Sequence, residues 1–152
     1  MKYDIRTFGV SALAFVAGLA AARLPLPAHA ASAPLTPQAI DLMAMGPADM
    51  PVASAKLPDL RTKVLVVTDG MTAAIQSGTS FKHYHADTDE IQIVLSGSGT
   101  EWLGDQQMTL RPGMMLVVPR GTAHGGFSAE SSDFKWVSFK SPPQDLSDSH
   151  PL

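Results

Sequence analysis

The sequence contains no cysteine, which excludes disulfides, cysteine nucleophiles and Cys-ligated iron–sulfur clusters. Charge is also scarce: only 16% of the 152 residues are charged, and the formal net charge is −3. This mildly acidic balance argues against a nucleic-acid-binding protein with a basic face. The 45% of hydrophobic residues is nevertheless typical of a globular chain, and the length is that of about one domain. The 12 glycines and 12 prolines favour a β-rich fold with many turns.

No uncharged run is long enough for an ordinary membrane-spanning helix. The apolar run Thr7–Ala22 has 16 residues, whereas a spanning helix needs about 20. Two basic residues precede this run, and the small-x-small sequence Ala28-His29-Ala30 follows it. The pattern is typical of a secretory signal peptide. We therefore predict that residues 1–30 are a signal peptide cleaved after Ala30, with Ala33 as the alternative. The mature chain is then periplasmic or secreted from a bacterium and has no stable membrane anchor.

The mature chain changes in character at about residue 61. Residues 31–60 predict a short N-terminal helix and an irregular lead-in, because Thr36 suits an N-cap, Pro37 a first helical position and Gly46 a C′ position. Residues 61–140 contain about nine short strand patterns between Lys63 and Lys140, separated by turn residues, which predicts a β-sandwich or barrel. Residues 141–152 contain three prolines and no apolar periodicity. They predict a flexible tail.

Three histidines and a glutamate lie within the predicted strands. His83 and His85 are two residues apart, so on a strand both imidazoles face the same side. Glu90 begins the next predicted strand, and His124 lies on a much later one. Imidazole and carboxylate together suit Mn, Fe, Co, Ni, Cu or Zn. Instead of binding a metal, each histidine could lie on the surface or be a hydrogen-bonded core residue. Asp89 is the substitute if Glu90 is not a ligand. Spacing alone does not place His124 beside the other three residues.

Two motifs in this region resemble those of the cupin superfamily. The first, G-x5-H-x-H-x3,4-E-x6-G, is matched by Gly78, His83, His85, Glu90 and Gly97, although only four residues separate Gly78 from His83. The second, G-x5-P-x-G-x2-H-x3-N, is matched by Gly113, Pro119, Gly121 and His124, with Ser128 in place of the final asparagine. The resemblance implies an all-β fold, an antiparallel jelly-roll β-barrel. It also implies that His83, His85, Glu90 and His124 hold one divalent transition metal per subunit (Fe, Mn, Ni, Cu or Zn).

Strand alternation extends this predicted site to a pocket. If His83 and His85 face inward, Phe81 does too, and Gln92 follows Glu90. By the same alternation Gly126 and Ser128 follow His124. Gln92 then either hydrogen-bonds a ligand or a metal-bound water, or is an ordinary polar residue of a barrel interior. No charged residue other than Glu90 is clearly assigned to the interior, which favours a neutral or weakly polar ligand.

The function expected from this site is a metal-dependent enzyme acting on a small oxygen-rich molecule. A dioxygenase is favoured over an isomerase or lyase, and Glu90 is a possible proton carrier. The alternative is a non-catalytic periplasmic module that binds a metal or small ligand; a metal-free barrel used for assembly is a third hypothesis. We also expect a homodimer that pairs through the hydrophobic strand Phe134–Phe139, a small-molecule ligand and no nucleic-acid partner.

Overall fold

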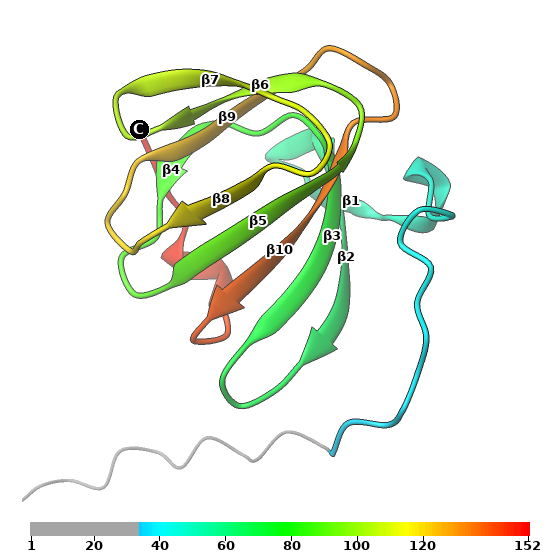
Figure 1. The fold of residues 1–152 in the computed structure, drawn as a ribbon. Coiled ribbons are helices and arrows are strands. Elements are labelled where there is room, and N and C mark those ends of the chain that lie inside the picture. The colour runs from blue at the N-terminus through cyan, green and yellow to red at the C-terminus, as the bar shows by residue number, and fades with distance from the viewer. Residues whose placement is uncertain (1–33) are drawn as a thin grey trace, which may run out of the picture.

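The computed structural model describes residues 34–152, which form two antiparallel β-sheets (Figure 1). In their order across the first sheet, the strands are β1 (Val52–Ser54), β2 (Leu57–Val67), β3 (Thr72–Gly78), β10 (Lys135–Ser141), β5 (Asp89–Ser96) and β8 (Met115–Val118). In the second sheet they are β11 (His150–Pro151), β4 (Lys82–Tyr84), β9 (His124–Ala129), β6 (Gly99–Leu103) and β7 (Gln106–Leu110). The predicted all-β jelly-roll fold is confirmed.

The two sheets enclose the core. Along β5, buried residues alternate with more exposed ones, as expected for a strand with one face inside. Side chains from both sheets form one hydrophobic cluster: Leu60, Val94, Leu110, Leu116, Val118, Phe127, Phe134 and Trp136. The rings of Phe127 and Trp136 stack with their centroids 4.2 Å apart. Phe134 and Trp136 are thus core residues.

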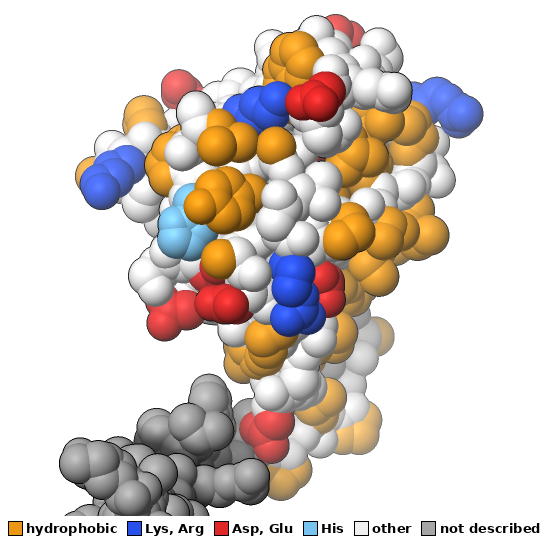
Figure 2. Space-filling view, turned by 90° about the vertical axis from the view of Figure 1, so that its left-hand side faces the viewer, with side chains coloured by type: hydrophobic (Ala, Val, Ile, Leu, Met, Phe, Trp, Pro, Cys, Tyr) orange, Lys and Arg blue, Asp and Glu red, His pale blue; other side chains and the backbone are white. Residues whose placement is uncertain are grey.

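The strand Phe134–Phe139, which we expected to pair across a dimer, lies in the middle of a sheet. Its equivalent β10 pairs with β3 on one side and β5 on the other. Both edges of its backbone are therefore used within the chain, and this part of the dimer prediction is wrong. The outer side of the neighbouring β5–β8 pair is more accessible: Ile91, Met115 and Val117 are 40%, 62% and 56% exposed. Figure 2 shows hydrophobic side chains gathered along one edge of the face it draws. The homodimer itself remains a prediction.

The predicted N-terminal helix is not formed in the described part of the lead-in. The Asp41 carboxylate accepts hydrogen bonds from the backbone N–H groups of Met43 and Ala44, at 3.0 and 3.1 Å. This local turn competes with a helix for the same donors. The carbonyls of Met43 and Met45 instead accept bonds from Nζ of Lys135, at 2.8 Å each. Only a 3-10 turn, η1 (Pro47–Asp49), follows.

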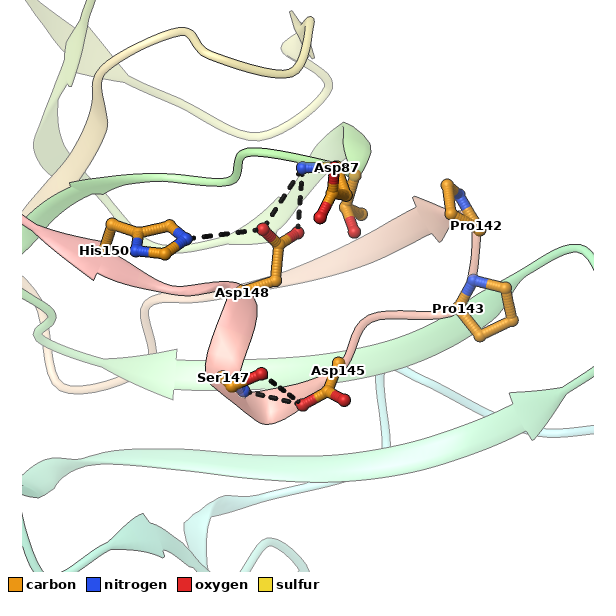
Figure 3. Close-up of a pocket in the computed structure, with 8 residues that line it drawn as sticks. Asp87, Pro142, Pro143, Asp145, Ser147, Asp148 and His150 are labelled. Carbon is orange, nitrogen blue, oxygen red and sulfur yellow. Dashed lines mark hydrogen bonds and ion pairs between the residues drawn. The ribbon is translucent and has the colours of Figure 1, made fainter. Parts of the chain in front are cut away.

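The C-terminal segment packs on the barrel, contrary to the prediction of a flexible tail. After a 3-10 turn, η2 (Leu146–Asp148), strand β11 pairs with β4 and adds to the second sheet. The buried carboxylate of Asp148 accepts hydrogen bonds from the backbone N–H groups of Ala86 at 2.7 Å and Asp87 at 3.1 Å, the second of which is seen in Figure 3. These contacts span more than 60 residues of sequence, so a local pattern could not predict them.

The predicted signal peptide, residues 1–30, lies outside the described residues. Within residues 34–152, no helix has the length and hydropathy that crossing a membrane would require.

Candidate metal centre

Strand pairing brings the three histidines together. His83 on β4 and His124 on β9 are direct partners in the antiparallel register. His85 follows two residues after His83, and its ring centroid lies 5.0 Å from that of His83 and 5.1 Å from that of His124. One ring nitrogen from each histidine lies within 4.8 Å of the other two. The structure therefore supplies the placement of His124 that sequence spacing does not give.

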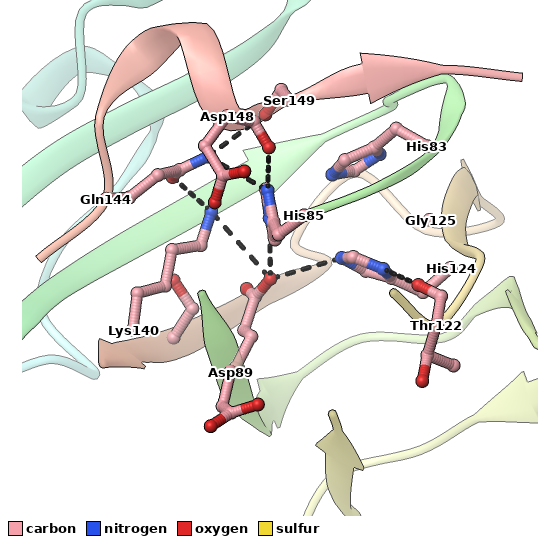
Figure 4. Close-up of polar contacts among 12 residues, drawn as sticks. His83, His85, Asp89, Thr122, His124, Gly125, Lys140, Gln144, Asp148 and Ser149 are labelled. Atoms are coloured by element: carbon pink, nitrogen blue, oxygen red, sulfur yellow. Dashed lines mark hydrogen bonds and ion pairs between the residues drawn. The ribbon is translucent and has the colours of Figure 1, made fainter. Parts of the chain in front are cut away.

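Backbone carbonyls fix how the three imidazoles are oriented. Each Nδ1 lies within hydrogen-bond distance of one carbonyl oxygen: His83 with Phe81 (2.9 Å), His85 with Asp148 (2.8 Å) and His124 with Thr122 (2.9 Å). Figure 4 shows the contacts of His85 and His124. Carbonyls only accept, so each Nδ1 carries the proton. Each Nε2 is then left with a lone pair, the tautomer in which histidine ligates metals.

Glu90 on β5 brings a carboxylate to the same point. Its Oε2 lies 3.3 Å from Nε2 of His85 and 3.2 Å from Nε2 of His124. Burial raises the pKa of Glu90, but the positive charge of Lys140 lowers it, and the pKa lies well below its ordinary value. Glu90 is therefore an ionised carboxylate inside the barrel.

The converging atoms suit a cation. With each Nδ1 proton used by a carbonyl, the Nε2 atoms and the Glu90 carboxylate are all electron-pair donors. Nε2 of His85 is buried and makes no hydrogen bond. Burial, together with repulsion from His124, lowers the pKa of His83 to about 4, so this imidazole is neutral near pH 7. Three imidazole Nε2 atoms and one carboxylate are a ligand set for a divalent transition metal.

Asp89, the substitute ligand considered from sequence, points away from this cluster. It is exposed and binds Arg120, with Oδ2 2.7 Å from a guanidinium nitrogen and Oδ1 2.8 Å from the backbone nitrogen. Asp89 instead fixes the turn that precedes β9.

Comparison with known proteins agrees with this geometry. The family Cupin_2, the cupin domain, matches residues 65–140, which is half of the chain. This chain belongs to the cupin family. No curated protein gives a significant match. Among solved structures, KdgF from Halomonas sp. is 26% identical, with a TM-score of 0.53 over 58% of this cupin and 84% of that chain. Streptomyces Pac13, a nucleoside dehydratase, is 16% identical, with a TM-score of 0.54 over 62% and 78%, and shows the fold alone.

A cavity of about 540 Å³ opens beside the candidate metal centre of this cupin. Phe81 and Gln92 line it, together with His83 and Glu90. Its apolar wall is formed by several side chains of the two sheets, among them Leu57, Leu60, Val64, Phe127 and Trp136. The volume is sufficient for a small organic molecule.

Gly126 and Ser128 do not line this cavity, which corrects the alternation expected from His124. Gly125 and Gly126 both have positive φ (+82° and +64°), and the register between β6 and β9 shifts beside them. At the two glycines the inward and outward positions of β9 exchange, so Phe127 faces inward and Ser128 is exposed. A Cβ on Gly126 would point at Trp102. Regular alternation fails here because a bulge inserts one residue into the pattern.

Two charged residues of the interior were missed from sequence. Lys140 lies on the inner side of β10, in step with the core residue Trp136, so alternation along that strand could have found it. Glu101 on β6 is 0% exposed and accepts a hydrogen bond from the Gly125 N–H at 3.1 Å. Burial, with a smaller contribution from the charge of Glu90, raises the pKa of Glu101 to about 8. Near pH 7 it is mostly a neutral acid.

Replacing Gly125 by alanine is expected to weaken metal binding about ten- to a hundredfold, the range for losing an outer hydrogen bond of a ligand. The new Cβ would lie 2.8 Å from both Nδ1 of His83 and the carbonyl oxygen of Phe81, so it breaks the bond that orients this ligand. Gly113→Ala is the matched control, because φ is +86° there and nothing lies within 4 Å. Competition with a chelator measures the affinity. An equal loss in both variants would contradict the prediction.

Glu101→Gln is expected to change how stability depends on pH. Because the pKa is raised from 4.5 to about 8, the folded wild type keeps a proton that the unfolded chain releases. Its free energy of unfolding therefore falls, relative to the variant, as pH rises from 4.5 towards 8, by up to about 1.4 kcal/mol per pH unit. Denaturant titration of both metal-free proteins at pH 5 and pH 8 tests this. A stability difference that is the same at both pH values would be inconsistent with a raised pKa.

Proposed function

We propose that this cupin is a metal-dependent enzyme that acts on a small oxygen-rich molecule, with dioxygenase chemistry favoured over isomerase or lyase chemistry. The observation that carries the proposal is the convergence of three histidine ring nitrogens and the Glu90 carboxylate at the wall of a cavity. His83, His85, His124 and Glu90 would hold the ion. A bound Fe or Cu ion would supply oxygen activation, whereas Mn, Ni or Zn would supply polarisation of a carbonyl or enol oxygen.

The preference for a dioxygenase rests on how few proton carriers line the cavity. Among the described lining residues, Glu90 is the only carboxylate, and its lowered pKa makes it a weak base. Isomerases and lyases use a positioned acid and base at the substrate. The apolar wall of the cavity, in contrast, suits oxygen and the apolar part of a substrate. A specific observation supports the second candidate: Nζ of Lys140 lies 3.7 Å from Glu90, which pairs a proton donor with an acceptor.

We also propose that the chain is exported and works as a homodimer. The signal-peptide pattern of residues 1–30 supports export to the periplasm or beyond. The apolar outer side of β5 and β8 supports association. Amino-terminal sequencing of secreted protein and light scattering of the purified mature chain test these two points.

Oxygen uptake and metal content together test the enzymatic proposal. The mature protein is isolated from the periplasm without added metal, and its metal is measured. It is then screened with small phenolic, enolic and diketone compounds in an oxygen electrode, and for isomerised or eliminated products by NMR. Turnover that requires the bound metal is expected. Stoichiometric metal and ligand binding without any turnover would instead identify a non-catalytic binding module, and absence of metal would contradict the site.

A further inference from the structure

Lys140 is buried at the polar end of the cavity, beside the metal centre. Only 9% of the residue is exposed, and its Nζ lies 2.5 Å from Oε1 of Gln144 and 3.7 Å from Oε2 of Glu90. The amide nitrogen of Gln144 donates a hydrogen bond to Oγ of Ser149 at 3.0 Å. These contacts turn the Gln144 oxygen toward Lys140 and hold the ammonium group at the cavity wall (Figure 4).

The register of the sheet explains why Lys140 and the metal centre share one cavity. Lys140 is the direct partner of Glu90, and Ser138 is the direct partner of Gln92, across the β10–β5 pair. Directly opposite residues of an antiparallel pair project to the same side. All four residues line the cavity. An ammonium group has three N–H donors, of which Gln144 takes one, and Glu90 at 3.7 Å is beyond ordinary hydrogen-bond distance.

The charges that line the cavity do not balance once a divalent ion is counted. The described lining contains Lys56, Lys140 and Glu90 as its ordinarily charged groups. Three neutral imidazoles, a doubly charged cation, the Glu90 carboxylate and the Lys140 ammonium leave two positive charges in the inner part. Glu101, which lies behind Gln92 and Gly125, adds little negative charge because its pKa is about 8. Uncompensated charge in a buried site is costly, so the cavity favours an anion.

We propose that the cavity binds a small organic carboxylate that has an oxygen atom on the carbon next to its carboxyl group. The carboxylate pairs with Lys140, and the adjacent oxygen reaches the histidine cluster. Glu90 lies between them, 3.7 Å from Nζ of Lys140 and 3.2 Å from Nε2 of His124, so one short ligand spans both positions. The apolar wall takes the rest of the molecule. This proposal rests on the proposed function, since the histidines must hold an ion, and it corrects the expectation of a neutral ligand.

Calorimetry with a charged and a neutral form of the same ligand tests this proposal. The probes are mandelate, an aromatic α-hydroxy acid, and mandelamide, its uncharged amide. Metal-containing wild type is expected to bind mandelate at least about tenfold more tightly than mandelamide. Lys140→Met is expected to weaken mandelate binding about ten- to a hundredfold and to leave mandelamide unchanged. Lys140→Arg should retain most of the affinity for mandelate. Lys56→Met, at the exposed cavity lysine, is the control and should match wild type.

Each possible failure has a distinct meaning. Equal binding of the acid and the amide, equal loss of mandelate binding in Lys140→Met and Lys140→Arg, or no loss in Lys140→Met would overturn the carboxylate proposal. Displacement of mandelate by inorganic phosphate at similar concentration would overturn the choice of a carboxylate over other anions. Metal content is measured separately in every variant, so the proposed function stands or falls on that measurement and not on the calorimetry.

Discussion

Replacing both His83 and His124 by alanine is expected to remove the metal from the purified protein, from about one equivalent per chain to less than about a tenth. The reason is geometric. The two residues are direct cross-strand partners, and each presents an Nε2 lone pair whose tautomer is fixed by a carbonyl. Without them, His85 and Glu90 are the remaining members of the cluster, too few to compete with water for the ion. Elemental analysis of protein exported to the periplasm measures the change.

The control for this variant is His150→Ala. His150 stacks on Tyr84 outside the cluster, with ring centroids 4.9 Å apart, and its side chain is 43% exposed. Its removal should leave the metal content unchanged. If both proteins lose the metal equally, or if the double variant keeps it, the assignment of the centre is wrong.

Replacing Asp148 by alanine is expected to lower the free energy of unfolding by about 1 to 3 kcal/mol, because it removes the hydrogen bonds from the backbone N–H groups of Ala86 and Asp87, each with a net value of about 0.5–1.5 kcal/mol. Metal affinity should fall as well, since the carbonyl of Asp148 orients His85 at 2.8 Å and loosening η2 moves that carbonyl. Urea denaturation and competition with a chelator measure the two effects.

Asp145→Ala provides a control in the same segment. Asp145 is exposed and caps η2 through Ser147, with no contact to His85 among its described hydrogen bonds. Its loss should lower the free energy of unfolding much less than Asp148→Ala does, and should leave metal affinity intact. Equal effects of the two substitutions would show that the C-terminal segment does not support the metal centre.

Much of the fold was predictable because it depends on local patterns. Short strand patterns separated by turn residues predicted nine strands between residues 63 and 140. The structure contains a strand at each of these places. Two further strands were not predicted, because β1 and β11 are only three and two residues long. The helix predicted near Thr36 was wrong. The capping residue and the glycine were present, but Asp41 closes a local turn that competes with the helix.

Local sequence patterns likewise predicted some residues of the site but not others. The pairing of His83 with His85 follows from the two-residue repeat of a strand, and the motif spacing identified Glu90 and His124 as their partners. The same alternation, counted forward from Trp136 through Ser138, would have predicted that Lys140 faces inward. Phe127 was not, because positive φ at Gly125 and Gly126 breaks the alternation between His124 and Ser128.

The sequence by itself determined the all-β architecture and the set of metal-ligand types, because both are encoded in residue type and short spacing. Only the tertiary structure decided that His124 pairs with His83, that Lys140 pairs with Glu90 and that the carbonyl of Asp148 orients His85. The physical reason is that each of these contacts joins segments at least 40 residues apart, and sheet register and packing, not local preference, fix their distance.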